Sequence, residues 1–323
     1  MRSTKAEKHN IRDATIIVTG ACGFIGSHLI EKLLVIGVKK IIAIDSLEYG
    51  KTGNIPTDKR IVFVKHKLGT DPIANLLPHF KKSNYLFHLA AEKHNQSKDS
   101  PEKVIMANIT GMHQLLEAVQ SCGVKKVVFS SSLYAYGRMS KPKFQETDVI
   151  LPQTVYGMTK TSGEFLLAYF RRQYGLEYVA LRYLFVYGPR QYSNLGYKSV
   201  IVSNFNKIIK GEEPTIYGDG KQTLDYIYID DVVEATVKAM TTPLSGEVVN
   251  IGSGKEYDIN YLTATMLKVS KSNLKPHSMS PDWTAGTYRV GDVSKAKKVL
   301  GFSARTTLEK GLATTFHWIK NNS

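Results

Sequence analysis

The 323-residue chain is poor in cysteine and lacks a long hydrophobic run. Its two cysteines, Cys22 and Cys122, lie far apart and belong to no C-x-x-C motif or Cys/His cluster, so we expect no disulfide framework and no structural metal. No apolar stretch approaches the ~18 residues that a membrane span needs, and residues 1–13 lack the apolar segment of a signal peptide. The sequence therefore predicts a cytoplasmic protein without a membrane partner or a metal site.

Long blocks of like charge are also missing, although basic residues predominate. The 43 Lys and Arg residues exceed the 28 Asp and Glu residues, which gives a formal net charge of +15. The cations are scattered in doublets such as Lys39-Lys40 and Lys125-Lys126, a pattern that favours a basic surface and an anionic small-molecule substrate. Binding of nucleic acid or of an acidic protein is the less favoured alternative.

The sequence has no linker, repeat or low-complexity segment, whereas 42% of its residues are hydrophobic, enough for a large core. Apolar β-rich runs alternate with amphipathic stretches, which predicts βαβ units. Because the apolar runs are nearly continuous, the strands should form a parallel sheet covered on both faces, a doubly wound α/β fold. The expected strands span residues 14–19, 40–44, 61–65, 85–90, 126–131 and 178–183, and the expected helices span residues 24–36, 73–80, 104–121 and 154–174.

After residue 183 the alternation becomes less regular, which indicates a smaller second lobe. We expect a first domain over residues 1–183 and a lobe over residues 184–323, from which some segments return to the sheet. Without a linker, the two parts should interleave and form a ligand cleft at their interface. The elements expected in the second part are helices at 199–210 and 230–240 and strands at 225–229 and 248–251.

A glycine-rich loop stands between the first predicted strand and its helix. Its G-x-x-G-x-x-G pattern allows a tight turn and a close approach of a pyrophosphate to the N-terminus of the helix. Asp45 ends the second strand, where a carboxylate binds both hydroxyls of the adenosine ribose, and no cation follows to accept a 2′-phosphate, so NAD is the expected cofactor. The residues expected at the cofactor from this pattern are Gly20, Gly23, Phe24, Ile25, Gly26 and Asp45.

A serine run and a Tyr-x-x-x-Lys pair carry the predicted chemistry. Residues 130–132 end a strand, and Tyr156 and Lys160 lie one helical turn apart, so their side chains should share a face. An ammonium beside a phenol should lower the pKa of Tyr156 and make it a general base. We predict Ser132, Tyr156 and Lys160 as catalytic residues, with Lys160 also holding the nicotinamide ribose.

Together these motifs resemble those of the extended short-chain dehydrogenase/reductases, and within them the NAD-dependent nucleotide-sugar epimerase/dehydratase group of the UDP-glucose 4-epimerase type. The resemblance extends from Thr15 to Ile319 and implies a Rossmann-type fold with an interleaved C-terminal lobe that binds the substrate. It is also carried by residues 88–91, 181–183, 186–190, 217–220, 225–231 and 250–254.

The resemblance implies further site residues. At the cofactor these are Ala90, Ala91, Lys93, Asn108, Ser130, Tyr156 and Lys160. At the nucleotide-sugar substrate they are Ser132, Tyr156, Phe185, Arg190, Lys198, Tyr217 and Arg289.

A homodimer is implied as well. In this family the Tyr-x-x-x-Lys helix and the long helix before it commonly form an intersubunit bundle. The helix expected at 154–174 carries more apolar residues than one face needs, among them Phe165, Leu166, Ala168, Tyr169 and Phe170. Burial of all of them within one subunit is the alternative.

Three departures from the family pattern concern phosphate and adenine contacts. Phe185 replaces a common Asn and Leu224 a common Arg, both of which usually bind the diphosphate of the sugar nucleotide. Residues 66–68, His-Lys-Leu, replace an acidic residue often used around adenine. The cations that remain to bind the diphosphate are Lys198, Lys221, Arg190 and Arg289.

The residues after Ser132 bear on the reaction type. Dehydratases of this group carry an Asp-Glu pair there, whereas this chain has Leu133 and Tyr134. Without that acid–base pair, Ser, Tyr and Lys are suited to taking a hydride from a sugar alcohol and returning it, so C4 epimerisation of a nucleotide hexose is the preferred function. Glu92 and His94 are interpreted as polar loop residues, with a role at the sugar as the alternative.

Two other functions stay open. The first is a dehydratase or oxidoreductase of the same family. The second is a non-catalytic NAD-binding module with a nucleic-acid or protein partner, which the altered diphosphate contacts and the positive charge favour. The intact Ser, Tyr and Lys set argues for an enzyme, because a binding protein has no need for a phenol beside an ammonium.

Overall fold

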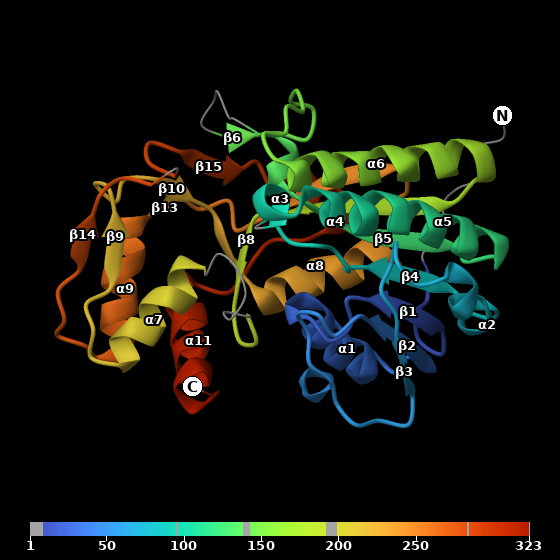
Figure 1. Ribbon diagram of the computed structural model, residues 1–323, viewed down its shortest axis with the longest axis horizontal. Coiled ribbons are helices and arrows are strands. Elements are labelled where there is room, and N and C mark those ends of the chain that lie inside the picture. The colour runs from blue at the N-terminus through green and yellow to red at the C-terminus, as the bar shows by residue number, and fades with distance from the viewer. Residues whose placement is uncertain (1–8, 95, 138–142, 192–198, 283, 323) are drawn as a thin grey trace.

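The computed structural model describes residues 9–94, 96–137, 143–191, 199–282 and 284–322. Its central element is a sheet of seven parallel strands in the order β12-β7-β5-β4-β1-β2-β3 (Figure 1). All seven were predicted to within two residues at either end. They are β1 (Thr15–Thr19), β2 (Lys40–Asp45), β3 (Ile61–Lys65), β4 (Tyr85–His88), β5 (Lys126–Ser132), β7 (Glu177–Tyr183) and β12 (Glu247–Ile251).

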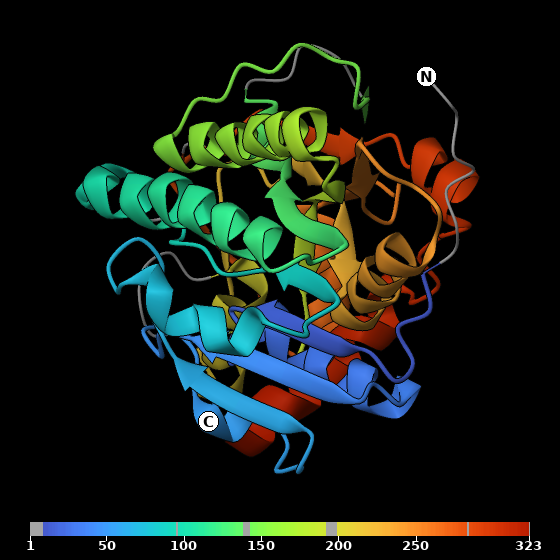
Figure 2. The same ribbon diagram turned by 90° about the vertical axis from the view of Figure 1, so that its right-hand side faces the viewer.

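Helices cover both faces of this sheet, as the edge-on view shows (Figure 2). α1 (Phe24–Ile36) and α8 (Ile229–Thr241) lie on one face, and α2 (Leu77–Phe80), α5 (Gly111–Ser121) and α6 (Val155–Tyr174) lie on the other. In β1, Val18 packs in the core with α1 and α8, whereas its neighbour Ile17 packs in the core with α5 and α6. The doubly wound α/β fold is thereby confirmed, and burial on both faces explains the nearly continuous apolar runs.

Two predicted helices are interrupted in the structure. Residues 73–80 form the 3₁₀-helix η2 (Ile73–Leu76) and then α2, and the stretch before α5 divides into α3 (Gln96–Asp99), α4 (Pro101–Ile105) and the π-helix η3 (Met106–Thr110). The π-helix lies where the chain approaches the loop after β3, since a Cβ on Gly69 would lie 2.1 Å from the Met106 carbonyl oxygen. Hydrophobic periodicity does not reveal such a tertiary contact.

The C-terminal lobe consists of small sheets beside three packed helices, α7 (Val200–Ile209), α9 (Ile259–Ser270) and α11 (Leu308–Asn322) (Figure 1). One sheet has the order β13-β10-β15-β6, and two others pair β11 with β8 and β14 with β9. Most of these strands have two to four residues, too few for a clear periodic signal in the sequence. They are β6 (Lys143–Phe144), β8 (Phe185–Tyr187), β9 (Thr215–Tyr217), β10 (Thr223–Leu224), β11 (Tyr226–Tyr228), β13 (Tyr257–Asp258), β14 (His277–Met279) and β15 (Tyr288–Gly291).

The chain crosses between the sheet and the lobe more than once. β6 precedes residue 183 in the sequence but pairs with β15 in the lobe, whereas β12 follows that residue and pairs with β7 in the main sheet. α10 (Ser294–Leu300) also packs against β12. The two parts therefore interleave. Within the described parts of the chain, no helix combines the length and apolar composition that crossing a membrane requires.

Candidate active site

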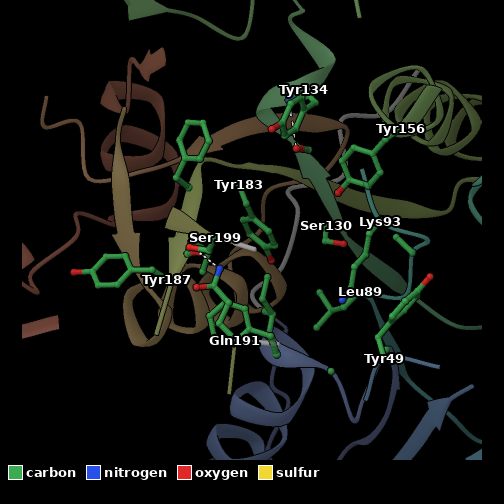
Figure 3. A pocket seen from close by; sticks show the side chains of 18 of the residues that line it. Tyr49, Leu89, Lys93, Ser130, Tyr134, Tyr156, Tyr183, Tyr187, Gln191 and Ser199 are labelled. Atoms are coloured by element: carbon green, nitrogen blue, oxygen red, sulfur yellow. Dashed lines mark hydrogen bonds between the residues drawn. The ribbon is translucent and has the colours of Figure 1, made fainter. Parts of the chain in front are cut away.

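A cavity of about 740 Å³ lies between the main sheet and the lobe. One wall comes from the loops that follow β1 to β5, and the other comes from β8, α7, β9, β10 and β15. Figure 3 shows Tyr49, Leu89 and Lys93 on one side of the cavity and Tyr134 and Tyr156 on another. The carboxyl ends of parallel strands and the interface between two lobes are the usual places for a ligand in such folds.

The glycine loop joins β1 to α1 without room for side chains. Gly20 has a φ of +68°, and a Cβ on Gly26 would lie 2.1 Å from the Gly20 carbonyl oxygen. Gly23 is the N-cap of α1 and makes no side-chain cap, so the first N–H groups of the helix stay available. Phe24 and Ile25, in the first turn, also line the cavity. This open, positive end of a helix fits a pyrophosphate group.

Asp45 ends β2 and lines the cavity with 7% of its surface exposed. Its Oδ2 accepts a hydrogen bond from the Cys22 N–H at 2.9 Å, and its Oδ1 accepts one from the Leu47 N–H at 2.8 Å. Burial raises the pKa of the Asp45 carboxyl, although both N–H groups oppose that shift. The carboxylate is thus held beside the glycine loop, as ribose recognition requires. Burial also raises the pKa of the Cys22 thiol to about 12, so Cys22 fills space near the loop.

The loop after β4 forms the next part of the wall. Ala90, Ala91 and Lys93 line the cavity, and Lys93 Nζ lies 4.2 Å from the centroid of the Tyr49 ring (Figure 3). Burial lowers the pKa of Lys93. Glu92 lies between Ala91 and Lys93 in the sequence, and its carboxylate accepts a hydrogen bond from the Tyr49 hydroxyl at 2.6 Å. The loops after β2 and β4 are therefore joined across the cavity.

Asn108 supports this loop from behind and is not among the residues that line the cavity. It lies on the π-helix, and its Oδ1 accepts a hydrogen bond from the Glu92 N–H at 2.7 Å while its Nδ2 donates to the Glu92 carbonyl at 3.1 Å. The side-chain amide also donates to Thr159 Oγ1 at 3.1 Å. The predicted contact between Asn108 and the cofactor stays a prediction, and in the structure the π-helix directs the Asn108 amide to the Glu92 backbone.

Ser132, Tyr156 and Lys160 all line the middle of the cavity. Ser132 ends β5, and α6 begins after Thr154, whose Oγ1 accepts the Gly157 N–H at 3.1 Å. This cap places Tyr156 and Lys160 on the first two turns of α6, where one helical turn separates them, as predicted.

A hydrogen bond joins Lys160 to the backbone of Ser130 near the Tyr156 phenol. Lys160 Nζ donates to the Ser130 carbonyl at 2.7 Å and lies 5.5 Å from the centroid of the Tyr156 ring. Ser130 lines the cavity, and its Oγ donates to the His88 carbonyl at 3.2 Å.

The pKa values correct one expectation. Burial raises the pKa of Tyr156 above its ordinary value, and a hydrogen bond with Ser132 only partly opposes this shift. Burial lowers the pKa of Lys160 to about 7, against the opposing charge of Glu164. Burial therefore has a larger effect on the pKa of the phenol than the nearby Lys160 amine, which donates to the Ser130 carbonyl.

Two aromatic rings enclose the phenol. The His94 ring stacks on Tyr134 with centroids 4.1 Å apart, and each ring lies 6.0 Å from the Tyr156 ring in an edge-on arrangement. Tyr134 belongs to η4 (Leu133–Ala135) and lines the cavity. Sequence reasoning noted Tyr134 only as a replacement for an acid, and its position two residues after Ser132 was the available signal. An imidazole and a phenol thus lie beside the Tyr156 ring, where dehydratases are expected to carry carboxylates.

The lobe contributes an arginine to the cavity. Leu224 in β10 and Arg289 in β15 are neighbours in register on parallel strands, so their side chains share one face of the sheet. Both line the cavity, as do Phe185 and Tyr217. The Arg289 guanidinium lies 5.9 Å from the centroid of the Tyr134 ring. Arg289 therefore provides a cation beside the position where the family arginine is replaced by Leu224.

The other predicted cations are placed differently. Arg190 forms a bidentate pair with Glu31 of α1, at 2.9 and 2.7 Å, and donates to the carbonyl of Asn54 in η1 (Thr52–Asn54) at 2.8 Å. It does not belong to the cavity wall, because these contacts direct its guanidinium toward α1. Lys221 is exposed and lies 4.0 Å from Asp219. Lys198 lies outside the described residues.

A family model decides the assignment. The model described as "NAD dependent epimerase/dehydratase family" matches residues 16–252. The chain belongs to this family. A UDP-glucose 4-epimerase from Mycolicibacterium smegmatis is 31% identical over 319 residues, covering 95% of this chain and 99% of the relative. A dTDP-glucose 4,6-dehydratase from Streptomyces antibioticus is 28% identical over 95% of this chain and 92% of its own length, so the relatives of this epimerase/dehydratase include both kinds of enzyme.

Solved structures agree with this assignment. The UDP-N-acetylglucosamine 4-epimerase of Methanobrevibacter ruminantium, in complex with UDP-N-acetylmuramic acid, has a TM-score of 0.91 and 31% identity, covering 97% of this chain and all of that one. The UDP-glucuronic acid 4-epimerase of Bacillus cereus, in complex with UDP-glucuronic acid and NAD, has a TM-score of 0.85 and 30% identity, covering 96% of this chain and all of that one.

NAD is the cofactor of this family member, and the described residues fit it. The open end of α1 would hold the pyrophosphate, Asp45 the adenosine ribose, and Ser130, Tyr156 and Lys160 the nicotinamide end. Among the described residues, no group of three or more His, Cys, Asp or Glu side chains is arranged to hold a metal ion.

Proposed function

We propose that this protein is an NAD-dependent nucleotide-sugar 4-epimerase that acts on a UDP-hexose. The observation that carries the proposal is the meeting of Ser132, Tyr156 and Lys160 at the junction between the dinucleotide wall and the lobe, with Leu133 and Tyr134 directly after the serine. The 4-epimerase relatives, and the UDP-sugars named in their structures, support the substrate class.

NAD supplies hydride acceptance and return when it is bound. Tyr156 then removes the proton of the sugar 4-hydroxyl, and Ser132 shares its hydrogen bond with the phenol. Positive charge near the ring lowers the cost of forming the phenolate, and Lys160, 5.5 Å from the ring centroid, is the residue that provides it. Inversion at C4 requires that the sugar present its other face to the nicotinamide side of the cavity, after which Tyr156 would return the proton to the 4-oxygen.

The lobe binds the nucleotide and the diphosphate. We expect Arg289 of β15 to contact the diphosphate, and Tyr217 of β9 also lines the cavity. Tyr217 is 41% exposed, so its ring is available to stack against a nucleobase.

Dehydration is the second candidate, because a dehydratase is among the relatives. It requires a general acid and a second base at the sugar. His94 and Tyr134 are the groups in the corresponding place, and they stack on each other at 4.1 Å rather than forming a carboxylate pair. This arrangement favours epimerisation.

The test is incubation with UDP-glucose, UDP-galactose, UDP-N-acetylglucosamine and UDP-glucuronic acid, followed by NMR analysis of the product. Interconversion of a 4-epimer pair without net NADH is the expected result. A 4-keto-6-deoxy product would establish dehydration instead. A protein that binds NAD but turns over none of the four sugars would favour the non-catalytic module.

We further propose a homodimer formed by α5 and α6, which lie side by side at one edge of the molecule (Figure 2). Met158, Phe165 and Tyr169 follow one stripe of α6 and are 54%, 64% and 43% exposed. Burying such a stripe against a second copy removes apolar surface from water.

Sedimentation of a variant tests this interface. Phe165→Glu should convert the dimer into a 36.0 kDa monomer. Val35→Glu, at an 81% exposed site on α1, should leave the dimer intact, and a monomeric unmodified protein would refute the interface.

A cytoplasmic location is also proposed. Both cysteines are free thiols, which suits a reducing compartment. Fractionation of cells that express the full chain is the direct measurement, and recovery with the membrane or secreted fraction would contradict it.

A further inference from the structure

The adenine end of the cavity can be located from Asp45. This residue ends β2 and faces the ribose, and β3 is the next strand outward in the sheet. The base that follows the ribose must therefore lie between the loop after β2 and the loop after β3. The polar residues that line the cavity there are Ser46, Glu48, His66 and Lys67.

Glu48 and Lys67 join these two loops. Lys67 Nζ lies 2.8 Å from Glu48 Oε2, and the two side chains are 35% and 33% exposed, respectively. Burial favours a raised pKa for Glu48, but the hydrogen bond and charge of Lys67 outweigh it and lower the pKa. Glu48 is thus a carboxylate at the edge of the cavity, with its position set by a cation from the neighbouring strand.

The other carboxylates at this end are engaged elsewhere. Asp45 accepts two backbone N–H groups, Asp71 Oδ2 accepts the Lys67 N–H at 2.7 Å, and Glu92 accepts the Tyr49 hydroxyl at 2.6 Å. Burial raises the pKa of Glu92, and the neighbouring charge of Glu48 adds to this shift. Glu48 and Glu92 also share a side-chain hydrogen bond, which lowers the pKa of Glu48 and raises that of Glu92, so Glu48 is the acceptor of the pair. Among these acids, Glu48 is therefore the one that combines a charged acceptor with a place on the cavity wall beyond the ribose.

His66 is a second polar feature of this end. His66 is buried, with 4% of its surface exposed, and its Nε2 has no hydrogen-bond partner in the described part of the chain. A buried ring nitrogen without a partner is costly, and such sites are commonly completed by a ligand or by water. His66 is therefore a further polar residue beside the Glu48–Lys67 pair in this part of the cavity wall.

Adenine matches the Glu48–Lys67 pair chemically. Its 6-amino group donates a hydrogen bond directly beside N1, which accepts one, whereas a carboxylate beside an ammonium offers an acceptor beside a donor. We propose that Glu48, positioned by Lys67, recognises the adenine of NAD by accepting a hydrogen bond from the 6-amino group, with Lys67 facing N1. The acidic residue absent from the end of β3 is thereby replaced by one from the loop after β2. The proposal depends on NAD binding in this cavity, and it does not depend on which sugar is turned over.

The test compares NAD with nicotinamide hypoxanthine dinucleotide, in which a 6-oxo group replaces the 6-amino group and N1 carries a hydrogen. Calorimetric titration of cofactor-free protein needs no sugar and no turnover. The unmodified protein should bind NAD about 10- to 100-fold more tightly than the analogue, since a hydrogen bond to a charged acceptor is lost and an acceptor faces a carboxylate. In Glu48→Gln the ratio should fall to about threefold or less, because an amide can donate to the 6-oxo group as well as accept from the 6-amino group.

Two control variants separate base recognition from general effects. Glu309→Gln removes a similar exposed ion pair, with Lys268 at 3.0 Å on the far side of the lobe, and should leave the ratio unchanged. Asp45→Asn should weaken both dinucleotides equally, because it acts at the ribose. Equal affinities of the unmodified protein for both dinucleotides, or an undiminished ratio in Glu48→Gln, would overturn the proposal. Failure to bind NAD at all would instead refute the assignment of the whole cavity, including the proposed epimerase function.

Discussion

The two walls of the cavity are built in different ways. On the sheet side, the glycine loop follows β1, and Asp45 and the serine run lie at the carboxyl ends of β2 and β5, so their positions follow from the order of the strands. On the lobe side, Arg289 and Leu224 come from strands of four and two residues that are distant in sequence and meet only through pairing in register.

The comparison indicates how each wall can compensate for a family residue that this chain lacks. On the sheet side, the acidic residue missing after β3 would be replaced by Glu48 from the loop after β2, which Lys67 holds at 2.8 Å. On the lobe side, a cation lost at residue 224 is available from Arg289 on the adjacent strand, because neighbouring strands present side chains to the same face.

Tyr156→Phe tests the point where the two walls meet. The phenylalanine ring preserves packing but cannot accept the sugar proton, so turnover should fall by about 10²–10⁴. NAD binding, measured by calorimetry, should change little, because the glycine loop, Asp45 and Lys160 are unchanged and the phenol is only one of several groups at the nicotinamide end. Unchanged turnover in this variant would show that Tyr156 is not the general base.

The pH dependence of folding stability tests the role of Asp225, a buried carboxyl between two short strands of the lobe. It connects β10 to β11 and accepts hydrogen bonds from the Ser253 N–H at 2.7 Å and hydroxyl at 2.6 Å, while burial raises its pKa from 3.8 to about 6. As pH rises from about 4 to 6, the unfolded chain loses this proton first, so Asp225 should remove up to about 3 kcal/mol of folding stability.

The measurement is denaturant unfolding of the unmodified chain and Asp225→Asn across that range of pH. The stability of the unmodified chain relative to the variant should decline between pH 4 and 6. A constant difference would mean that the folded carboxyl titrates as it does in the unfolded chain.

Arg289→Met tests compensation on the lobe side. Loss of a cation at the diphosphate should weaken nucleotide-sugar binding by about 10- to 100-fold and leave NAD affinity unchanged. Adding Leu224→Arg to this variant should recover part of the loss, because residue 224 lies beside residue 289 on the same face. Lys221→Met is the control, since Lys221 is exposed beside Asp219. If this control weakened binding as much as Arg289→Met does, Arg289 would not be a specific contact of the diphosphate.

Arg190→Met should have the smallest effect. The Arg190–Glu31 pair lies outside the cavity wall and Glu31 is 46% exposed, so the change should cost at most about 1 kcal/mol in thermal or denaturant unfolding. The KM for the nucleotide sugar should not change. An increase in KM as large as that of Arg289→Met would return Arg190 to the substrate site.

Several features could be predicted from the sequence because they depend on local or periodic signals. Continuous apolar runs indicated the seven strands, the spacing of Gly20, Gly23 and Gly26 indicated the dinucleotide loop, and a four-residue spacing placed Tyr156 and Lys160 on one face of α6. The two spacings reflect backbone geometry that is the same in any tertiary context, and the apolar runs reflect burial of the strands on both faces of the sheet.

Other features were decided by the tertiary structure alone. On the π-helix, Asn108 bonds to the Glu92 backbone, and Arg190 pairs with Glu31 of α1. Burial raises the pKa of Tyr156 although Lys160 lies nearby. Pairing of short strands brought Arg289 beside Leu224. The orientation of a long side chain and the pKa of a buried group depend on partners from distant segments, and only packing brings those partners together.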